Sequence, residues 1–337
     1  MATIYEVSKL AGVSLATVSR VMNNKGKVSE STRLKVLEAM KQLDYRPNTL
    51  AQSLAANRSN CVGILVSELH GPICGVMLSS IEEELTRAGK FTLFAAAHSD
   101  AEKEKQGIEF LTTRNCDALI LHVEALKNEF FTARRDRLLP FVLLNRAVPG
   151  LEKNCISLNV EWGGYKATRM LIQMGHREIA YISGPLSWGD AQARLAGHRR
   201  ALAESRIEFD EQLVVEGDYH DDGGSRAMEF ILKLGRPLTA VVCANDEMAV
   251  GAMDAIRRSG RSIPEDISIV GFDNVRWARY LFPKLTTIDY PVSEMSRMAT
   301  RWVLRNVYGN DQLDIQNVFH PKLVTRASAA PPTGLMA

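Results

Sequence analysis

The chain has 337 residues, enough for two or three domains, and its 46% hydrophobic and 24% charged residues are typical of globular proteins. This composition excludes disordered, collagen-like and coiled-coil proteins, and no apolar run approaches the roughly 18–20 residues that a membrane span needs. The N-terminus lacks the order of a signal peptide, and the five cysteines form no C-x-x-C pair, so we expect a cytoplasmic protein without a disulfide framework.

Charge is distributed unevenly along the chain. Residues 1–60 carry nine Lys or Arg against four acidic residues, a net charge of +5, whereas the remainder carries a net charge of −3. A small basic head on a nearly neutral body indicates that the head meets a polyanion. The alternative, on charge alone, is a solvated helix face.

The first residues predict two short helices joined by a tight turn. Thr3 and Glu6 have the spacing of a capping box, which opens a helix that runs to about Leu10. Gly12 suits a sharp turn, and Ser14 can cap the next helix with its hydroxyl. Together these features form a helix-turn-helix pattern, which pairs of purely structural helices can imitate.

The second predicted helix, over about 15–22, has two faces. Val18 and Val21 can face the first helix, which leaves a polar side exposed. On that side, Arg20 can pair bidentately with a guanine edge, and Ser or Thr hydroxyls can reach phosphates or base edges. A third helix is predicted over about 29–43.

From Cys61 onward, short apolar runs alternate with longer amphipathic segments. This alternation predicts an α/β protein with two lobes, each a parallel sheet with helices on both faces. The tail, 327–337, is rich in Ala and Pro without periodicity and is expected to fray. The predicted strands are 62–66, 91–95, 118–121, 141–144, 179–182, 240–243 and 267–271, and the predicted helices lie near 74–88, 102–113, 162–174, 190–204, 224–233, 246–258 and 292–308.

Residues 3–23, TIYEVSKLAGVSLATVSRVMN, closely resemble the head of the LacI/GalR family of bacterial transcription repressors. The resemblance continues through the YRPN run at 45–48 and the VGFDN run at 270–274, and it covers the chain to about Arg326. It implies a doubly wound, periplasmic-binding-protein-like body behind an all-α helix-turn-helix head and a hinge helix. The implied boundaries are a head at 1–46, a hinge or linker at 47–59, and a body at 60–337, with a first lobe of about 60–159 plus a crossover at 288–320 and a second lobe of about 160–287.

The resemblance implies that the head and hinge of a homodimer bind palindromic operator DNA. The stretch 48–56 is too short to be a stable helix alone, which suits a hinge helix that orders only on DNA. Leu54 would wedge into the minor groove, unstack a base step and bend the duplex; the alternative is a core leucine. The implied DNA-binding residues are Thr3, Ser14, Leu15, Ala16, Thr17, Ser19, Arg20, Asn23, Asn48, Leu54 and Ala55.

The resemblance also implies a small-molecule effector held between the lobes. Segments 144–156 and 286–291 are similar to the galactose-repressor subgroup, which implies a galactose-like sugar that acts as inducer. The side chains alone leave alternatives open: Asn245 as a helix cap, Asp273 as a turn residue and Arg194 as a surface arginine. The implied effector-binding residues are His70, Asn145, Arg194, Asn245, Asp273 and Tyr290.

One segment departs from the family pattern. After the first strand, family members often carry an Asn-Pro-aromatic-aromatic run, but here Ile73 and Cys74 replace the aromatic pair. Because an aromatic residue there commonly forms one wall of the ligand pocket, the ligand could sit differently or differ from galactose. Trp188 and Tyr219 could supply another stacking face, or could simply pack within loops.

We therefore predict an effector-controlled repressor and no enzyme, because the chain lacks the common nucleotide-binding, serine-hydrolase and zinc-protease motifs. No cofactor, metal or membrane partner is expected, since the run His220-Asp221-Asp222 is typical of a solvated loop. Pro331 and Pro332 exclude a C-terminal leucine-heptad helix, which favours a dimer over a tetramer. The alternatives are a corepressor-type regulator that binds a purine or another non-sugar metabolite, and a sugar-binding module without a DNA role.

Overall fold

The computed structural model describes residues 2–22, 26–45 and 58–333. Contacts divide the chain into two compact units, Met1–Asn60 and Cys61–Ala337. Asn23, Asn48, Leu54 and Ala55, four of the implied DNA-binding residues, lie outside the described residues, as does most of the implied hinge.

The first unit contains the predicted helices α1 (Ile4–Ala11), α2 (Leu15–Met22) and α3 (Glu30–Gln42). The capping box is present, since the Thr3 hydroxyl accepts from the Glu6 amide and the Glu6 carboxylate accepts from the Thr3 amide. Gly12 then ends α1 in the left-handed conformation, with φ of 64°, which only glycine adopts without strain.

The core of the first unit forms where the three helices meet. Val18 and Val21 are buried, as the pattern of α2 predicts, and they lie in one cluster with Val7 of α1. The third helix buries Val36 and Ala39, whereas its leucines at 34 and 37 are exposed. The spacing of Leu34, Leu37, Met40 and Leu43 predicts that these side chains share the buried face of α3. This prediction is wrong for Leu34 and Leu37, whereas Met40 and Leu43 pack against the cluster.

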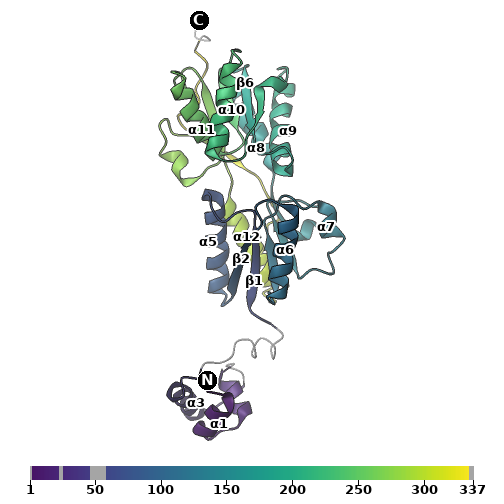
Figure 1. Cartoon of the computed structure of the whole chain (residues 1–337), viewed down its shortest axis with the longest axis vertical. Helices are drawn as coiled ribbons and strands as arrows, with labels where there is room; N and C mark the ends of the chain where they lie inside the picture. The colour runs from purple at the N-terminus through teal and green to yellow at the C-terminus, as the bar shows by residue number, and fades with distance from the viewer. Residues whose placement is uncertain (1, 23–25, 46–57, 334–337) are drawn as a thin grey trace. The chain divides into compact units, whose positions relative to one another are not determined.

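The second unit consists of two lobes, each built on a six-stranded sheet (Figure 1). The sheet orders are β11-β5-β4-β3-β1-β2 and β12-β10-β9-β8-β6-β7, and all pairings are parallel except that of β10 with β12. This confirms the predicted α/β class.

The first lobe contains β1 (Cys61–Val66), α5 (Pro72–Arg87), β2 (Phe91–Ala96), α6 (Ala101–Thr113), β3 (Ala118–Leu121), α7 (Asn128–Thr132), β4 (Phe141–Leu144), β5 (Cys155–Leu158), α12 (Val292–Asn306) and β11 (Val318–Phe319). The second contains α8 (Val160–Gln173), β6 (Ile179–Ser183), α9 (Gly189–Glu204), β7 (Val214–Glu216), α10 (Asp221–Lys233), β8 (Ala240–Cys243), α11 (Asp246–Arg258), β9 (Ser268–Asp273), β10 (Thr286–Asp289) and β12 (Lys322–Val324).

The chain passes between the lobes three times, after β5, after β10 and after β11. The third passage returns the chain to the second sheet. The expectation of a frayed tail is therefore wrong for the described tail residues, 327–333. Strand β9 pairs with β10 only from Val270 onward. The tail lies beside the part of β9 that precedes Val270. There the Ile269 amide donates to the Ser328 carbonyl at 2.8 Å, and Ser328 is fully buried.

Two glycines allow α8 and α9 to cross at close range. A Cβ atom on Gly164 would lie 2.1 Å from the carbonyl oxygen of Arg194, and one on Gly197 would lie 2.0 Å from the carbonyl oxygen of Glu161. No side chain fits at either position without moving one helix. The crossing therefore fixes the position of Arg194 on α9.

We expect Gly197→Ala to lower the free energy of unfolding by about 1–2 kcal/mol. Overpacking costs about 1–3 kcal/mol, and alanine regains roughly 0.5–1 kcal/mol through its better helix propensity. Gly189→Ala, at the start of the same helix, is the control because its Cβ would meet no atom within 4 Å. Urea unfolding of both variants measures the difference, and a stabilised Gly197→Ala would contradict the close crossing.

Candidate functional site

The exposed side of α2 carries the side chains that could meet a polyanion. Ala16 and Arg20 are exposed, whereas Leu15, Thr17 and Ser19 are half-buried. In the same unit, Tyr5 on α1 is 70% exposed, although the sequence pattern did not single it out. Tyr5 therefore adds an aromatic ring to the exposed surface of this unit.

Two of the implied DNA-binding residues have structural roles as well. Thr3 caps α1, and the Ser14 hydroxyl accepts from the Thr17 amide at 3.2 Å at the start of α2. The Thr17 hydroxyl lies 2.9 Å from that of Ser14. Because these hydroxyls hold the turn between the two helices, their replacement would affect the fold of the head as well as any contact with DNA.

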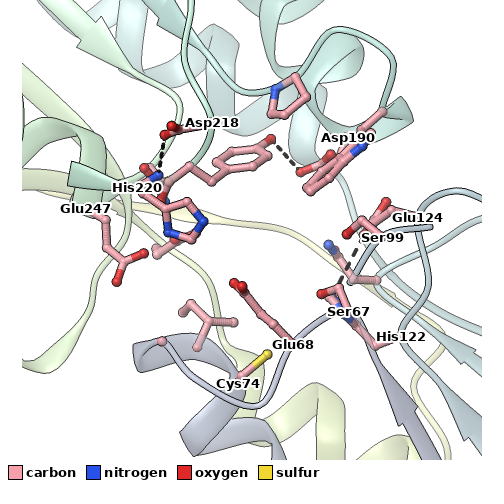
Figure 2. A pocket seen from close by; sticks show the side chains of 18 of the residues that line it. Ser67, Glu68, Cys74, Ser99, His122, Glu124, Asp190, Asp218, His220 and Glu247 are labelled. Carbon is pink, nitrogen blue, oxygen red and sulfur yellow. Dashed lines mark hydrogen bonds and ion pairs between the residues drawn. The ribbon is translucent and has the colours of Figure 1, made fainter. Parts of the chain in front are cut away.

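A cavity of about 400 Å³ lies between the two lobes of the body, and side chains from both lobes point into it (Figure 2). Its walls come from the carboxyl ends of the parallel strands, where open α/β sheets bind ligands. All six implied effector-binding residues line this cavity: His70, Asn145, Arg194, Asn245, Asp273 and Tyr290. The fold therefore brings the implied set together in one place.

Arg194 is 4% exposed, so the alternative of a surface arginine is wrong. Its Nη1 donates to the carbonyl oxygen of Ala244, and its Nη2 lies 3.5 Å from Oδ2 of Asp190. Nη1 also lies 3.7 Å from Oδ1 of Asp273, and the guanidinium carbon lies 3.9 Å from the centre of the Phe272 ring. These contacts fix the planar guanidinium in the cavity wall, and its buried Nε has no hydrogen-bond partner among the described residues.

Asn245 has the capping role that its position before a helix predicts. Its Oδ1 accepts from the Met248 amide at 2.9 Å, and its Nδ2 donates to the Tyr219 carbonyl at 2.8 Å. The alternative of a helix cap is therefore correct, and the same side chain also lines the cavity. Both of its polar atoms are already engaged, so it positions the cavity wall at least as much as it offers a contact.

Asp273 and Asn145 end strands in unusual backbone conformations, with φ of 112° and 58°. Such angles cost free energy for residues other than glycine and concentrate at functional sites. They turn each side chain away from the strand direction at the edge of its sheet. Asp273 is therefore more than an ordinary turn residue, because its carboxylate is 9% exposed within the cavity wall.

Several buried polar atoms around the cavity have no hydrogen-bond partner in the described part of the chain. Leaving such an atom unpaired costs about 1–3 kcal/mol, so a ligand that pairs with it gains affinity. Acceptors and donors both occur, which suits a ligand that can do either. The atoms are Asn145 Oδ1, Asp190 Oδ1, Asp273 Oδ1, His122 Nδ1, Arg194 Nε and the Tyr290 hydroxyl.

The implied effector-binding set does not include His122, Glu124 and Asp190, which are titratable residues of the cavity. Burial raises the pKa of the Glu124 carboxyl well above its usual range, and burial lowers the pKa of His122 to about 4. Near neutral pH, the buried imidazole is therefore neutral, and burial favours the neutral form of the Glu124 carboxyl. His122 and Glu124 directly follow β3, so the strand-end rule that singled out Asn145 after β4 could have found them.

Burial also raises the pKa of Asp273 well above its usual range, although Arg194 opposes this effect. A carboxyl in this state gains from hydroxyl groups that donate to it, because such donors stabilise its charged form. In the same lobe, Trp188 and Tyr219 approach with ring centres 5.7 Å apart, and Tyr219 donates to Asp190 at 2.8 Å. Their faces give the cavity an apolar surface beside its polar groups.

Asp246 is a fully buried carboxyl that supports the loop after β9. Its oxygens accept from the Thr287 hydroxyl at 2.5 Å and from the Val275 amide at 2.9 Å. Burial raises the pKa of Asp246 to about 7 in the folded chain. Between about pH 4 and pH 7 the folded state therefore holds a proton that the unfolded state has released.

This proton makes stability depend on pH through Asp246. The contribution of protonated Asp246 to the free energy of unfolding is complete below about pH 4. It is lost as the pH rises through 7, because the unfolded state binds fewer protons than the folded state over this range. We expect the wild type to lose about 1–4 kcal/mol relative to Asp246→Asn between pH 4 and pH 8. Urea unfolding of both proteins across this range measures the difference, and parallel pH profiles would contradict it.

The comparisons with known proteins point to one group. The model for bacterial regulatory proteins of the lacI family matches residues 3–48, and that for a periplasmic binding protein-like domain matches residues 168–329. The HTH-type transcriptional regulator GalR of Escherichia coli strain K12 is 41% identical over 333 residues, which is 99% of this chain and 97% of that protein.

Solved structures agree with these matches. The Lac repressor dimer bound to operator and the anti-inducer ONPF superposes with a TM-score of 0.87 at 30% identity, covering 98% of this chain and 99% of that one. The complex of the transcriptional regulator CelR with cellobiose gives a TM-score of 0.71 at 30% identity, covering 98% and 100%. Among the described residues, no helix is both long and apolar enough to cross a membrane.

Proposed function

The chain belongs to the lacI family of bacterial regulatory proteins, and we propose that a monosaccharide in the interlobe cavity controls its affinity for operator DNA. It is a DNA-binding transcriptional repressor with an effector-binding body, and its relatives are regulators rather than enzymes. The family resemblance of the sequence is thereby confirmed. The identity of the effector, the residues that bind it and the homodimeric state are parts of the proposal.

The observation that carries the ligand class is the ring of buried polar atoms without partners around the cavity. A sugar hydroxyl both donates and accepts, so one molecule can pair with Arg194 Nε as well as with Asp273 Oδ1. A ligand with acceptors alone would leave the carboxylates unsatisfied, and a purely apolar ligand would leave all six atoms unpaired. A cavity of about 400 Å³ accommodates a monosaccharide and its water.

Two relatives support a sugar. One solved neighbour is a regulator in complex with cellobiose, and GalR is similar over nearly the whole chain. The wall formed by Ile73 and Cys74 distinguishes this cavity from the aromatic pattern of the family. The apolar surface of Trp188 lies in the same cavity, and we propose it as the replacement against which the sugar ring packs.

The coupling between ligand and DNA follows from where the polar atoms originate. Asn145 and His122 belong to the first lobe, whereas Arg194 and Asp273 belong to the second. A ligand that pairs with both sets binds the closed cavity more tightly than the open one and shifts the population toward closure. In a dimer, this shift changes the spacing of the two heads that grip a palindrome, which is a coupling free energy between two sites.

The decisive experiment is a fluorescence anisotropy titration of a palindromic operator, selected from random sequence, with the full chain. Galactose, fucose, glucose, ribose and purine bases are each added at fixed salt concentration. We expect galactose or a close epimer to weaken binding and the purine bases to have no effect. A response to a purine base alone, or none to any sugar, would refute the sugar assignment while leaving the operator binding intact.

A further inference from the structure

A second group of ligand-type side chains lies at the rim of the cavity, away from the buried polar atoms. Glu68 and His70 follow β1 in the first lobe, and His220 precedes α10 in the second. One potential metal-ligand atom from each of the three lies within 4.8 Å of the other two. The sequence separates His70 from His220 by 150 positions, so only the fold brings them together.

The three side chains already approach the spacing of a coordination shell. Nε2 of His70 lies 3.2 Å from Oε2 of Glu68, and the rings of His70 and His220 stack with centres 5.9 Å apart and an interplanar angle of 13°. Zinc bonds of about 2.0–2.1 Å in a tetrahedral arrangement place neighbouring ligand atoms about 3.3 Å apart. The Glu68–His70 pair meets this spacing, and a small closure of the cavity would bring His220 to it.

The surroundings favour a cation at this position. Figure 2 shows the Glu68 carboxylate pointing from one lobe toward the imidazole of His220 on the other, with Glu247 beside it. The backbone amide of His220 donates to Oδ1 of Asp218 at 2.9 Å, which fixes the residue at the rim. Two imidazoles and one carboxylate are a ligand set that zinc takes in proteins, with a fourth position left open.

We propose that Glu68, His70 and His220 bind one Zn²⁺ ion that bridges the two lobes at the rim of the cavity. The ion would hold the lobes together because its ligands come from both, and its removal would release them. This inference rests on the rim residues and does not require the effector to be a sugar. It gives His70 a role distinct from the contact with the effector that the family resemblance implies.

The test is calorimetric titration of the full chain, freed of any polyhistidine tag, with ZnCl₂ in the absence of sugar. We expect one ion per chain, because Glu68, His70 and His220 form the one group of three or more potential metal ligands among the described residues. His70→Gln and His220→Gln should each weaken zinc binding by more than about tenfold, the loss that even an outer-shell partner of a metal ligand can cause. His98→Gln is the matched control, because His98 lines the same cavity outside the cluster.

Comparison of the two ligand variants tests the bridge. A loss in His70→Gln with unchanged binding in His220→Gln would place the ion on one lobe and overturn the proposal. So would equal zinc affinity in wild type and both variants. Circular dichroism confirms that the variants are folded, which is expected because the His70 side chain is 72% exposed. Zinc binding without any sugar response would count against the proposed effector and leave the metal site standing.

Discussion

Asp273→Ala is expected to lower affinity for the effector by about 2–3 kcal/mol, or roughly 30- to 150-fold, and to abolish the response of operator binding to it. The Oδ1 atom of Asp273 is buried without a hydrogen-bond partner among the described residues, and in the proposed complex the effector supplies the hydrogen bond that the variant loses. The change also removes the carboxylate that lies 3.7 Å from Arg194 Nη1, which leaves the guanidinium less well oriented. Calorimetric titration with galactose measures the loss.

The control for this variant is Asp254→Ala, because Asp254 is an exposed aspartate on α11 that pairs only with Arg258 on the surface. It should bind the effector like the wild type. Operator affinity without effector should be unchanged in both variants, since both residues belong to the second unit of the chain. An unaltered sugar affinity in Asp273→Ala would place the effector site elsewhere in the cavity or outside it.

The sequence was most informative where a local pattern decides the structure. Strands such as β3 and β4 are continuous apolar runs buried on both faces, so the bounds of each run located the strand to the residue. The strands β5, β7 and β12 are only three or four residues long, and nothing in their composition separates them from loops. They form because neighbouring strands offer unpaired edges, a tertiary cause that local sequence does not contain.

The cavity was predictable only in part, for a similar reason. The implied residues Arg194 and Asp273 come from a family pattern, and the structure brings them to one wall. The pKa values of His122 and Glu124 are shifted by burial, which depends on the tertiary structure around them. The pairing of His70 with His220 joins loops of different lobes, so the separate expectations of a solvated loop at His220 and of an effector contact at His70 could not reveal it.

Arg20→Ala is expected to weaken binding to the preferred operator by about 2–6 kcal/mol in the dimer and to relax discrimination at one base position of each half-site. Arg20 is exposed on α2, and its fork of donors matches the two acceptors of a guanine edge in the major groove. Each bidentate contact contributes about 1–3 kcal/mol of discrimination, and a dimer makes it twice.

Loss of a positive charge alone is expected to weaken binding without changing base preference. Lys35→Ala on α3 is therefore the matched control. Lys35 is an exposed cation of the same unit, and its loss should weaken binding to all sequences about equally if it meets phosphates. Selection of operators from randomised half-sites, at fixed salt, distinguishes the two variants. Arg20→Ala should return a consensus that is degenerate at one position, whereas Lys35→Ala should return the wild-type consensus. An unchanged consensus for Arg20→Ala would mean that Arg20 contacts the phosphate backbone, and base recognition would then depend on the first residues of α2, the half-buried Leu15 and the exposed Ala16.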